Sequence, residues 1–165
     1  MRKVITIDTM KCSGCRMCEI SCSLKHTGEC NPERSRIRSL MVEENGYLEF
    51  FPSTCMQCET AMCELACPTR AIKRNKETGA RMIDENRCIG CNACGFACPF
   101  GACFLDPTTG VTAVCDQCDG DPICVKLCPT EALQYVPRDQ VSIRLKRSGL
   151  ERLMGMVVIN RGSSE

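Results

Sequence analysis

The chain of 165 residues contains no tryptophan, two tyrosines, five phenylalanines and a single histidine. So few aromatic side chains do not suggest an aromatic substrate pocket, and the sequence has neither a Ser/His/Asp set nor a glycine-rich phosphate loop. No stretch approaches the ~20 apolar residues of a membrane-spanning helix. No block of lysine and arginine suggests a nucleic-acid partner. These absences point away from a nucleophilic hydrolase, a membrane-spanning protein and a nucleic-acid-binding protein.

The N-terminal segment also lacks the features of a secretion signal. Residues 1–8 contain no apolar run of signal-peptide length and no small-residue cleavage site. We therefore expect a cytoplasmic, reducing location, where thiols bind metal instead of forming disulfides. This expectation matters because 18 of the 165 residues are cysteine, a share that would indicate a disulfide scaffold in a secreted chain.

Sixteen of the eighteen cysteines fall into four quartets. In each quartet two cysteines are separated by two residues, a third follows, and the fourth comes four positions after the third. A proline follows the last cysteine of the second, third and fourth quartets. This spacing is typical of [4Fe–4S] ligation, so it predicts four clusters and a role in electron transfer. In chain order the quartets are Cys12, Cys15, Cys18 and Cys22; Cys55, Cys58, Cys63 and Cys67; Cys88, Cys91, Cys94 and Cys98; and Cys115, Cys118, Cys124 and Cys128.

The quartets alternate between a compact and a stretched type. Residues 12–18 of the first quartet match residues 88–94 of the third, and residues 63–72 of the second match residues 124–133 of the fourth. A duplicated two-cluster unit explains this order best. A tight loop can present three thiolates to one face of a cubane, so the fourth ligand must come from elsewhere in the chain. A glycine before the second cysteine of both compact quartets suits such a loop, because glycine tolerates positive φ.

The segments between the quartets are short. Alternating residues predict strands, and the Asn45-Gly46 pair is a strong hairpin signal. We expect one- or two-turn helices from the second or third cysteine of each quartet to the fourth, each ending near a proline. These elements predict an α+β fold of duplicated, bacterial-ferredoxin-like lobes with clusters at their core. The expected strand pair joins residues 4–8 to 133–136, and the expected hairpins lie within residues 37–51, 71–84 and 104–114.

The order of the quartets and the Cys-Pro-Thr-x-Ala element of residues 67–71 and 128–132 resemble a known family. This family comprises the four-cluster iron–sulfur subunits of the dimethyl sulfoxide reductase and formate dehydrogenase type. The likeness covers about residues 3–136 and implies a non-catalytic electron-transfer subunit of an oxidoreductase complex. The compact length and residues 144–150 look most like the small subunit of tungsten aldehyde oxidoreductases. Subunits of carbon monoxide dehydrogenases, hydrogenases or formate dehydrogenases are the alternatives.

The resemblance also implies which cysteines share a cluster, because in this family the outer two quartets pair with each other and so do the inner two. No quartet is incomplete, so four [4Fe–4S] clusters are implied. The implied layout is a four-cluster domain over residues 1–136 with two interleaved lobes and a hairpin insert over 31–54, followed by a tail over 137–165. The implied ligand sets are Cys12, Cys15, Cys18 and Cys128; Cys115, Cys118, Cys124 and Cys22; Cys55, Cys58, Cys63 and Cys98; and Cys88, Cys91, Cys94 and Cys67.

Three residues outside the quartets need an interpretation. Cys30 and Cys103 are expected to be small apolar core residues, the usual role of free cysteine. His26 is expected to have a surface or polar-packing role, and tuning or ligation of a cluster is the alternative.

The tail begins polar and basic and becomes apolar towards its end. Its apolar residues fall on one face of a predicted helix. We expect this face to pack on the chain itself, with docking to a partner or to another copy as the alternative. The residues of this face are Leu150, Leu153, Met154 and Val157.

The leading hypothesis is a subunit that carries single electrons between a catalytic subunit, of a tungsten or molybdenum enzyme, and a second redox partner such as a flavin subunit or ferredoxin. A freely diffusing polyferredoxin is the second hypothesis, and it differs by having no stable partner. A zinc-scaffolded interaction module is the third, because Cys-x-x-Cys pairs also bind zinc. Zinc sites usually lack a third and fourth cysteine at this spacing. Metal content distinguishes the zinc module from the electron-transfer subunit.

Overall fold

The computed structural model describes residues 2–44 and 46–142, and every element below belongs to this part of the chain. The fold mixes short helices with two-stranded antiparallel sheets, in agreement with the predicted α+β class. Short 3-10 helices occur at Thr9–Lys11, Pro32–Arg34, Gln117–Gly120 and Arg138–Gln140.

One sheet joins the two ends of the described chain. Strand β1 (Lys3–Ile7) pairs antiparallel with β8 (Leu133–Pro137), and Ile5 lies opposite Tyr135. This pairing confirms the predicted strand pair. Ile5 and Leu133 bury their side chains beneath the sheet, so it closes one side of the small core.

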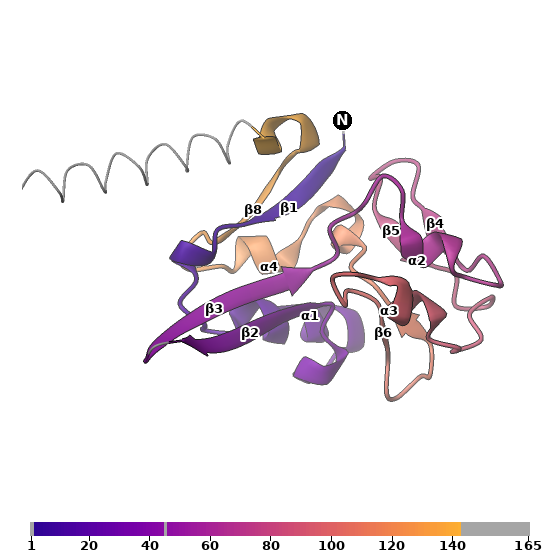
Figure 1. Cartoon of the computed structure of the whole chain (residues 1–165), viewed down its shortest axis with the longest axis horizontal. Helices are drawn as coiled ribbons and strands as arrows, with labels where there is room; N and C mark the ends of the chain where they lie inside the picture. Colours follow the sequence, from indigo (N-terminus) through magenta and orange to yellow (C-terminus); the bar gives the residue numbers. More distant parts are fainter. Residues whose placement is uncertain (1, 45, 143–165) are drawn as a thin grey trace, which may run out of the picture.

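The other three sheets are hairpins, and all three were predicted. The longest is formed by β2 (Ile37–Glu44) and β3 (Tyr47–Thr54), which run side by side in Figure 1. Two short hairpins follow at the expected places. They consist of β4 (Ile72–Arg74) with β5 (Arg81–Ile83), and of β6 (Phe104–Leu105) with β7 (Thr112–Ala113).

Three of the four predicted helices have the expected length. Helices α2 (Met62–Leu65), α3 (Ala93–Ala97) and α4 (Ile123–Lys126) each end just before a Cys-Pro pair. The prediction was wrong for α1 (Met17–Thr27), which has eleven residues and runs past Cys22. No proline follows this cysteine, so α1 continues until Gly28, whose left-handed conformation ends it.

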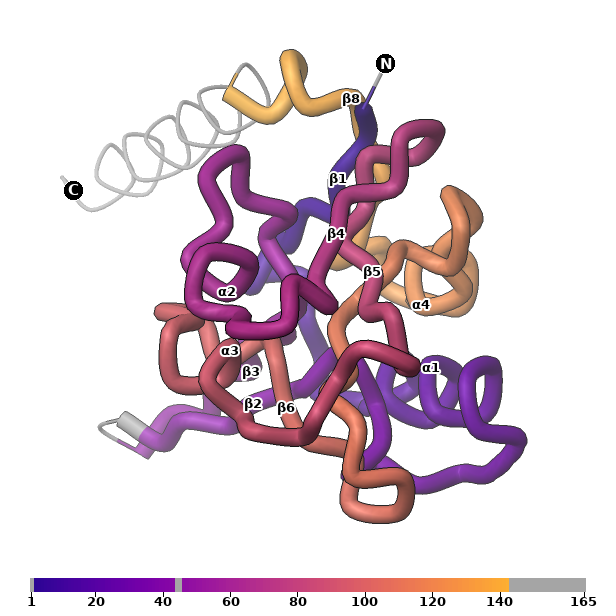
Figure 2. Tube along the Cα trace, turned by 90° about the vertical axis from the view of Figure 1, so that its right-hand side faces the viewer, coloured from indigo at the N-terminus to yellow at the C-terminus, as the bar shows by residue number. Residues whose placement is uncertain are grey.

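The elements form two halves, which lie side by side in Figure 1; in Figure 2 the half that contains α2 and α3 faces the viewer. Helix α1 packs against α4, and α2 packs against α3. The first half contains helices of the outer quartets together with the β1–β8 sheet and the long hairpin. The second contains helices of the inner quartets and the short hairpins. This grouping agrees with the implied pairing of the quartets, while the duplicated lobes and their boundaries stay predictions.

Arg34 and Arg38, just before and within β2, hold the halves together, and Arg36 between them makes an ion pair within the first half. The Arg34 Nε donates to Asp106 Oδ2 at 2.9 Å, and the Arg36 guanidinium lies 2.5 Å from the Asp116 carboxylate. The Arg38 guanidinium sits 5.3 Å from the centre of the Phe104 ring. One short segment thus presents cations to both halves of the molecule.

The apolar face predicted within the tail lies outside the described residues. Of the tail, the structure describes residues 137–142, which include the end of β8 at Pro137 and the last 3-10 helix at Arg138–Gln140. Within the described ranges, no helix is both long and apolar enough to cross a membrane.

The Arg34–Asp106 pair gives a test of how the halves are held. In an Asp106→Asn variant, Oδ1 can still accept from the N–H groups of Thr108 and Thr109, but the amide cannot accept from Arg34 in the same way. Both partners are largely buried, so we expect a loss of about 1–3 kcal/mol. The measurement is the rate at which anaerobic holo-protein loses its cluster absorbance in guanidinium chloride, because unfolding with cluster loss is irreversible.

The matched control is Asp121→Asn, which breaks the exposed ion pair between Asp121 and Lys126. Exposed pairs contribute about 0–1 kcal/mol, so this variant should bleach at nearly the rate of the parent protein. Equal bleaching rates for the two variants would contradict the role given to Asp106.

Candidate iron–sulfur centres

The first predicted ligand set gathers at the end of the molecule where α1 begins. Cys12, Cys15 and Cys18 line one small cavity together with Cys128, although Cys128 is more than a hundred residues later in the chain. Leu133 borders the same cavity. The structure therefore brings these four thiols together.

The corresponding set of the inner quartets gathers in the same manner. Cys88, Cys91 and Cys94 line a second small cavity with Cys67. A compact quartet thus again contributes three thiols, and the last cysteine of a stretched quartet contributes the fourth.

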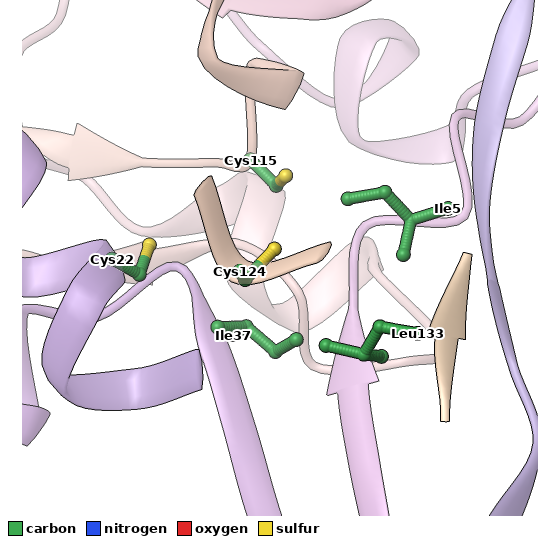
Figure 3. Packing of buried hydrophobic residues seen from close by; sticks show 6 residues of the cluster. All are labelled: Ile5, Cys22, Ile37, Cys115, Cys124 and Leu133. Atoms are coloured by element: carbon green, nitrogen blue, oxygen red, sulfur yellow. The ribbon is translucent and has the colours of Figure 1, made fainter. Parts of the chain in front are cut away.

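The second outer set is the most deeply buried. Cys124, on α4, lies close enough to Cys115, Cys22 and Cys118 for their charges to interact. Figure 3 shows three of these side chains on three separate segments, in one packed group with Ile5, Ile37 and Leu133. Apolar side chains therefore shield this group from water.

The remaining set lies in the second half. Cys55 interacts electrostatically with Cys63, Cys58 and Cys98. Cys55 also packs against both apolar clusters of the interior, so this one cysteine of the set lies at the junction of the halves. All four predicted sets are therefore assembled, although the assignment of each thiol to iron stays a prediction.

The thiols are held in a form that suits metal binding. All eighteen cysteines are free, so none of these groups is closed by a disulfide. Burial raises the pKa of Cys18 and Cys115 to about 12, and that of Cys55 to about 11. A buried thiolate therefore needs a positive charge beside it, which bound iron would provide. Four convergent thiols are the donor set that a [4Fe–4S] cluster takes, so the residues fit the group.

Backbone N–H groups point at the last sulfur of each quartet. The nitrogens of Ala71 and Ala102 lie 3.2 and 3.4 Å from the sulfurs of Cys67 and Cys98. Each alanine stands four residues after its cysteine and is buried. In the first quartet, which lacks the proline turn, the Arg36 nitrogen approaches the Cys22 sulfur at 3.3 Å instead.

These donors stabilise negative charge on sulfur. Although burial alone would raise it, hydrogen bonds from Thr69 and from the Ala71 backbone hold the pKa of Cys67 below its ordinary value. The same holds for the pKa of Cys128, where burial opposes hydrogen bonds from the Leu133 backbone and the Thr130 side chain. The Cys-Pro-Thr-x-Ala element therefore supplies both a hydroxyl and a backbone donor to its own cysteine.

The loops of the two compact quartets have the same backbone conformation. Arg16 and Asn92, at equivalent positions, both have φ 57° and ψ 11°. Gly14 and Gly90 have φ of +68° and +67°. At Gly90 a side chain would also meet the carbonyl oxygen of Gly110 at 2.6 Å, so this position needs glycine for space as well as for its φ.

Two buried glutamines have structural roles that we did not expect from the sequence. Gln57 and Gln117 stand just before the second cysteine of the stretched quartets, with φ of 51° and 60°. The Gln57 amide donates to the carbonyl of Cys115 at 2.7 Å, so it links the inner quartets to the outer ones. The Gln117 amide donates to the carbonyl of Lys3 at 3.1 Å. Their repetition in Cys-x-Gln-Cys was the signal that could have revealed them.

Cys30 and Cys103 were both expected to be buried core residues, and only one of them is. Cys103 is buried, as predicted, and its hydrogen bond lowers the pKa of Cys63, with a contribution from the nearby Arg81 guanidinium. Cys30 is exposed, so its predicted core role was wrong. It lies after Gly28, where the chain has left α1 and runs over the surface.

His26 lies in a polar and mostly buried position, which leaves both expected roles, polar packing and tuning of a cluster, open. Its side chain is mostly buried, and burial lowers its pKa, with a further contribution from Arg36. The ring lies between Asp116 and Cys118.

Comparisons with known proteins agree with this site. The family model of the 4Fe-4S dicluster domain matches residues 47–138. The chain is 43% identical over 129 residues to the polyferredoxin-like subunit of aliphatic sulfonate oxidoreductase from Pyrococcus furiosus, covering 75% of this chain and 70% of that protein. It is 32% identical over 169 residues to the electron transfer subunit of thiosulfate reductase from Salmonella typhi, covering 96% and 84%. It is 35% identical over 153 residues to a subunit of anaerobic dimethyl sulfoxide reductase from Escherichia coli, covering 82% and 73%.

The crowding at Gly90 leads to a testable expectation. Gly90→Ala should combine the strain of positive φ, about 1–2 kcal/mol, with an overpacking cost of about 1–3 kcal/mol against the Gly110 carbonyl. We expect this variant to be purified with less iron and to bleach faster in guanidinium chloride than the parent protein.

Gly110→Ala is the matched control, because Gly110 has φ +68° but nothing within 4 Å of an added side chain. It should show the strain alone and keep its full iron content. A Gly110→Ala protein as depleted in iron as Gly90→Ala would refute the steric argument.

Proposed function

The chain belongs to the 4Fe-4S dicluster domain family, and from this premise we propose that it is the electron-transfer subunit of a tungsten aldehyde oxidoreductase that works through four [4Fe–4S] clusters. The chain is a ferredoxin-like iron–sulfur subunit of the kind found in oxidoreductase complexes. The number of clusters, their ligands and the tungsten partner are what we propose.

The convergence of four thiol groups is the observation that carries the proposal. Each group combines three cysteines of one quartet with the last cysteine of another. A disulfide protein has no need of such fourfold groups, and zinc sites of the Cys-x-x-Cys type usually take two pairs. Four groups of this kind favour four cubane clusters along one molecule.

The residues of the chain hold and insulate the clusters in this proposal. The clusters themselves accept and release single electrons, which is the chemistry that the cofactor supplies. Ile5, Ile37 and Leu133 keep water from the most buried group. Backbone N–H groups such as that of Ala71 stabilise sulfur charge, and Arg34 and Arg38 fix the halves relative to each other.

Exposed apolar side chains offer docking faces beside the clusters. On α2 and α3, which pack together (Figure 2), Leu65 is 70% exposed and Phe96 is 88% exposed. Phe96 stands between the predicted ligands Cys94 and Cys98. A phenylalanine this exposed indicates a surface that a partner protein covers. We propose that this α2–α3 face docks a redox subunit.

The tungsten partner is supported by resemblance. The compact length and residues 144–150 look most like the small subunits of tungsten aldehyde oxidoreductases. The three relatives carry the names of a sulfonate, a thiosulfate and a sulfoxide enzyme, so related subunits serve catalytic partners with different substrates. We therefore propose that the substrate is chosen by the partner, and that this chain contributes the electron path.

Metal analysis tests the cluster count. Anaerobically purified protein should contain about sixteen iron and sixteen acid-labile sulfide per chain, with spin-coupled EPR signals after dithionite reduction. Cys124→Ala should lower both by about four, because one ligand set of four would be broken. Iron and sulfide analysis with EPR provides the measurement.

The control is Cys30→Ala, since Cys30 is exposed and outside the four groups. It should keep the full iron content. Stoichiometric zinc without sulfide in the natively prepared parent protein would overturn the electron-transfer proposal.

Purification of the native complex tests the partner. A tagged chain, isolated anaerobically from its own cells, should bring down a catalytic subunit that contains tungsten, detected by metal analysis of the complex. Phe96→Asp should reduce the recovery of a co-purifying subunit about tenfold or more, because a charge at the centre of an apolar interface commonly costs over 1–2 kcal/mol.

Asn86→Asp is the control for the added charge, because Asn86 is exposed and its amide and the new carboxylate have nearly the same size. It should leave recovery unchanged. Nickel or molybdenum in place of tungsten would assign the chain to one of the alternative enzymes, and a lone chain without partners would favour the free polyferredoxin.

A further inference from the structure

One candidate ligand has a second side chain directed at its sulfur. The Nε2 atom of His26 lies 3.6 Å from the Sγ atom of Cys118, within the range of an N–H···S hydrogen bond. His26 stands four residues after Cys22, so one face of α1 carries both towards the group formed with Cys115 and Cys124. The imidazole is largely buried, with 14% of its side chain exposed.

The imidazole is held in place by a fixed carboxylate. Asp116 Oδ1 lies 3.6 Å from the same Nε2 atom and accepts from the Cys118 backbone N–H at 2.9 Å. Asp116 Oδ2 lies 2.5 Å from the Arg36 guanidinium. Because Arg36 also donates its backbone N–H to the Cys22 sulfur, this polar chain runs from one ligand of the group to another.

The surroundings of Nε2 decide which ring nitrogen carries the proton. The two nearest polar atoms are a sulfur and a carboxylate oxygen, and a thiolate and a carboxylate only accept hydrogen bonds. The nitrogen that faces them is therefore the donor, and Nδ1 is free to be the unprotonated nitrogen of a neutral ring.

The repeat shows that this arrangement is particular to one group. The sequence position equivalent to His26 in the third quartet is Ala102, and the position equivalent to Asp116 in the second quartet is Met56. The His–Asp pair therefore has no counterpart in the inner pair of quartets, although the cysteine spacing is the same.

We propose that His26 is a positioning residue that donates an N–H···S hydrogen bond to Cys118 and raises the reduction potential of the cluster held with Cys22, Cys115 and Cys124. This inference rests on the proposed four-cluster function. Reduction adds one electron from the redox partner to the cluster, and the proton stays on Nε2. The added negative charge spreads onto the sulfur ligands, so a hydrogen bond to sulfur stabilises the reduced state more than the oxidised one.

The test is an EPR-monitored redox titration of holo-protein. His26→Leu removes the donor and keeps an apolar side chain of useful size, whereas His26→Gln keeps an N–H donor. We expect one of the four one-electron components to shift to lower potential in His26→Leu while the other three stay unchanged. His26→Gln should bring this component back towards its position in the parent protein.

Three results would overturn the inference. The first is that the potential of no EPR component shifts in His26→Leu, and the second is that it shifts as far in His26→Gln as in His26→Leu. The third is that His26→Leu has lost about four iron per chain, which would make His26 a ligand or a packing residue. Zinc bound beside the full iron content and lost in His26→Leu would also overturn it, because His26, Asp116 and Cys118 could together hold a separate cation. Failure of the proposed function looks different, because the parent protein itself would then lack iron and sulfide.

Discussion

The meeting of sulfur atoms from distant segments is the constraint on which this molecule depends. Among the described residues, eleven of the seventeen buried apolar residues are cysteine or alanine. Such small side chains bury little apolar area, and area burial is what normally stabilises a domain. Cys12, Cys15 and Cys18 gain their fourth neighbour only when Cys128 arrives. Metal binding and folding should therefore be one process, as in other small proteins whose metal sites form only in the folded state.

Polar contacts between the halves follow from this small core. With few large side chains to interlock, the halves are joined by Arg34 and Arg38, and by Gln57, whose amide reaches the carbonyl of Cys115. The side chains of Arg34 and Gln57 are largely buried, so their hydrogen bonds are geometrically demanding. A path for electrons requires fixed distances between clusters. Because the halves share no large apolar interface, the polar contacts between them keep these distances fixed.

The sequence predicted what depends on local chemistry. The β2–β3 hairpin and the strand pair of the two ends follow from alternation and turn residues, and the ends of α2, α3 and α4 follow from Cys-Pro pairs. The length of α1 was missed because Ser23 replaces the proline that stops its counterparts. The thiol groups could be anticipated through family resemblance, but the contacts of Arg34 and Arg38 could not, since their partners lie about seventy residues away. Nothing in the sequence around Cys30 indicates that its side chain is exposed.

The repeat explains why equivalent cysteines need not give equivalent clusters. Arg16 and Asn92 have the same backbone angles, so the compact quartets present their thiols alike. The charges around the groups differ: Arg81 is buried beside Cys63 in the second half, whereas Asp116 lies beside Cys118 in the first. A cation near sulfur favours the added electron, and an anion opposes it. Duplication thus gives the chain similar groups of four thiols. The charged residues around each group can give its cluster a reduction potential of its own, and these differences can set the direction of electron flow.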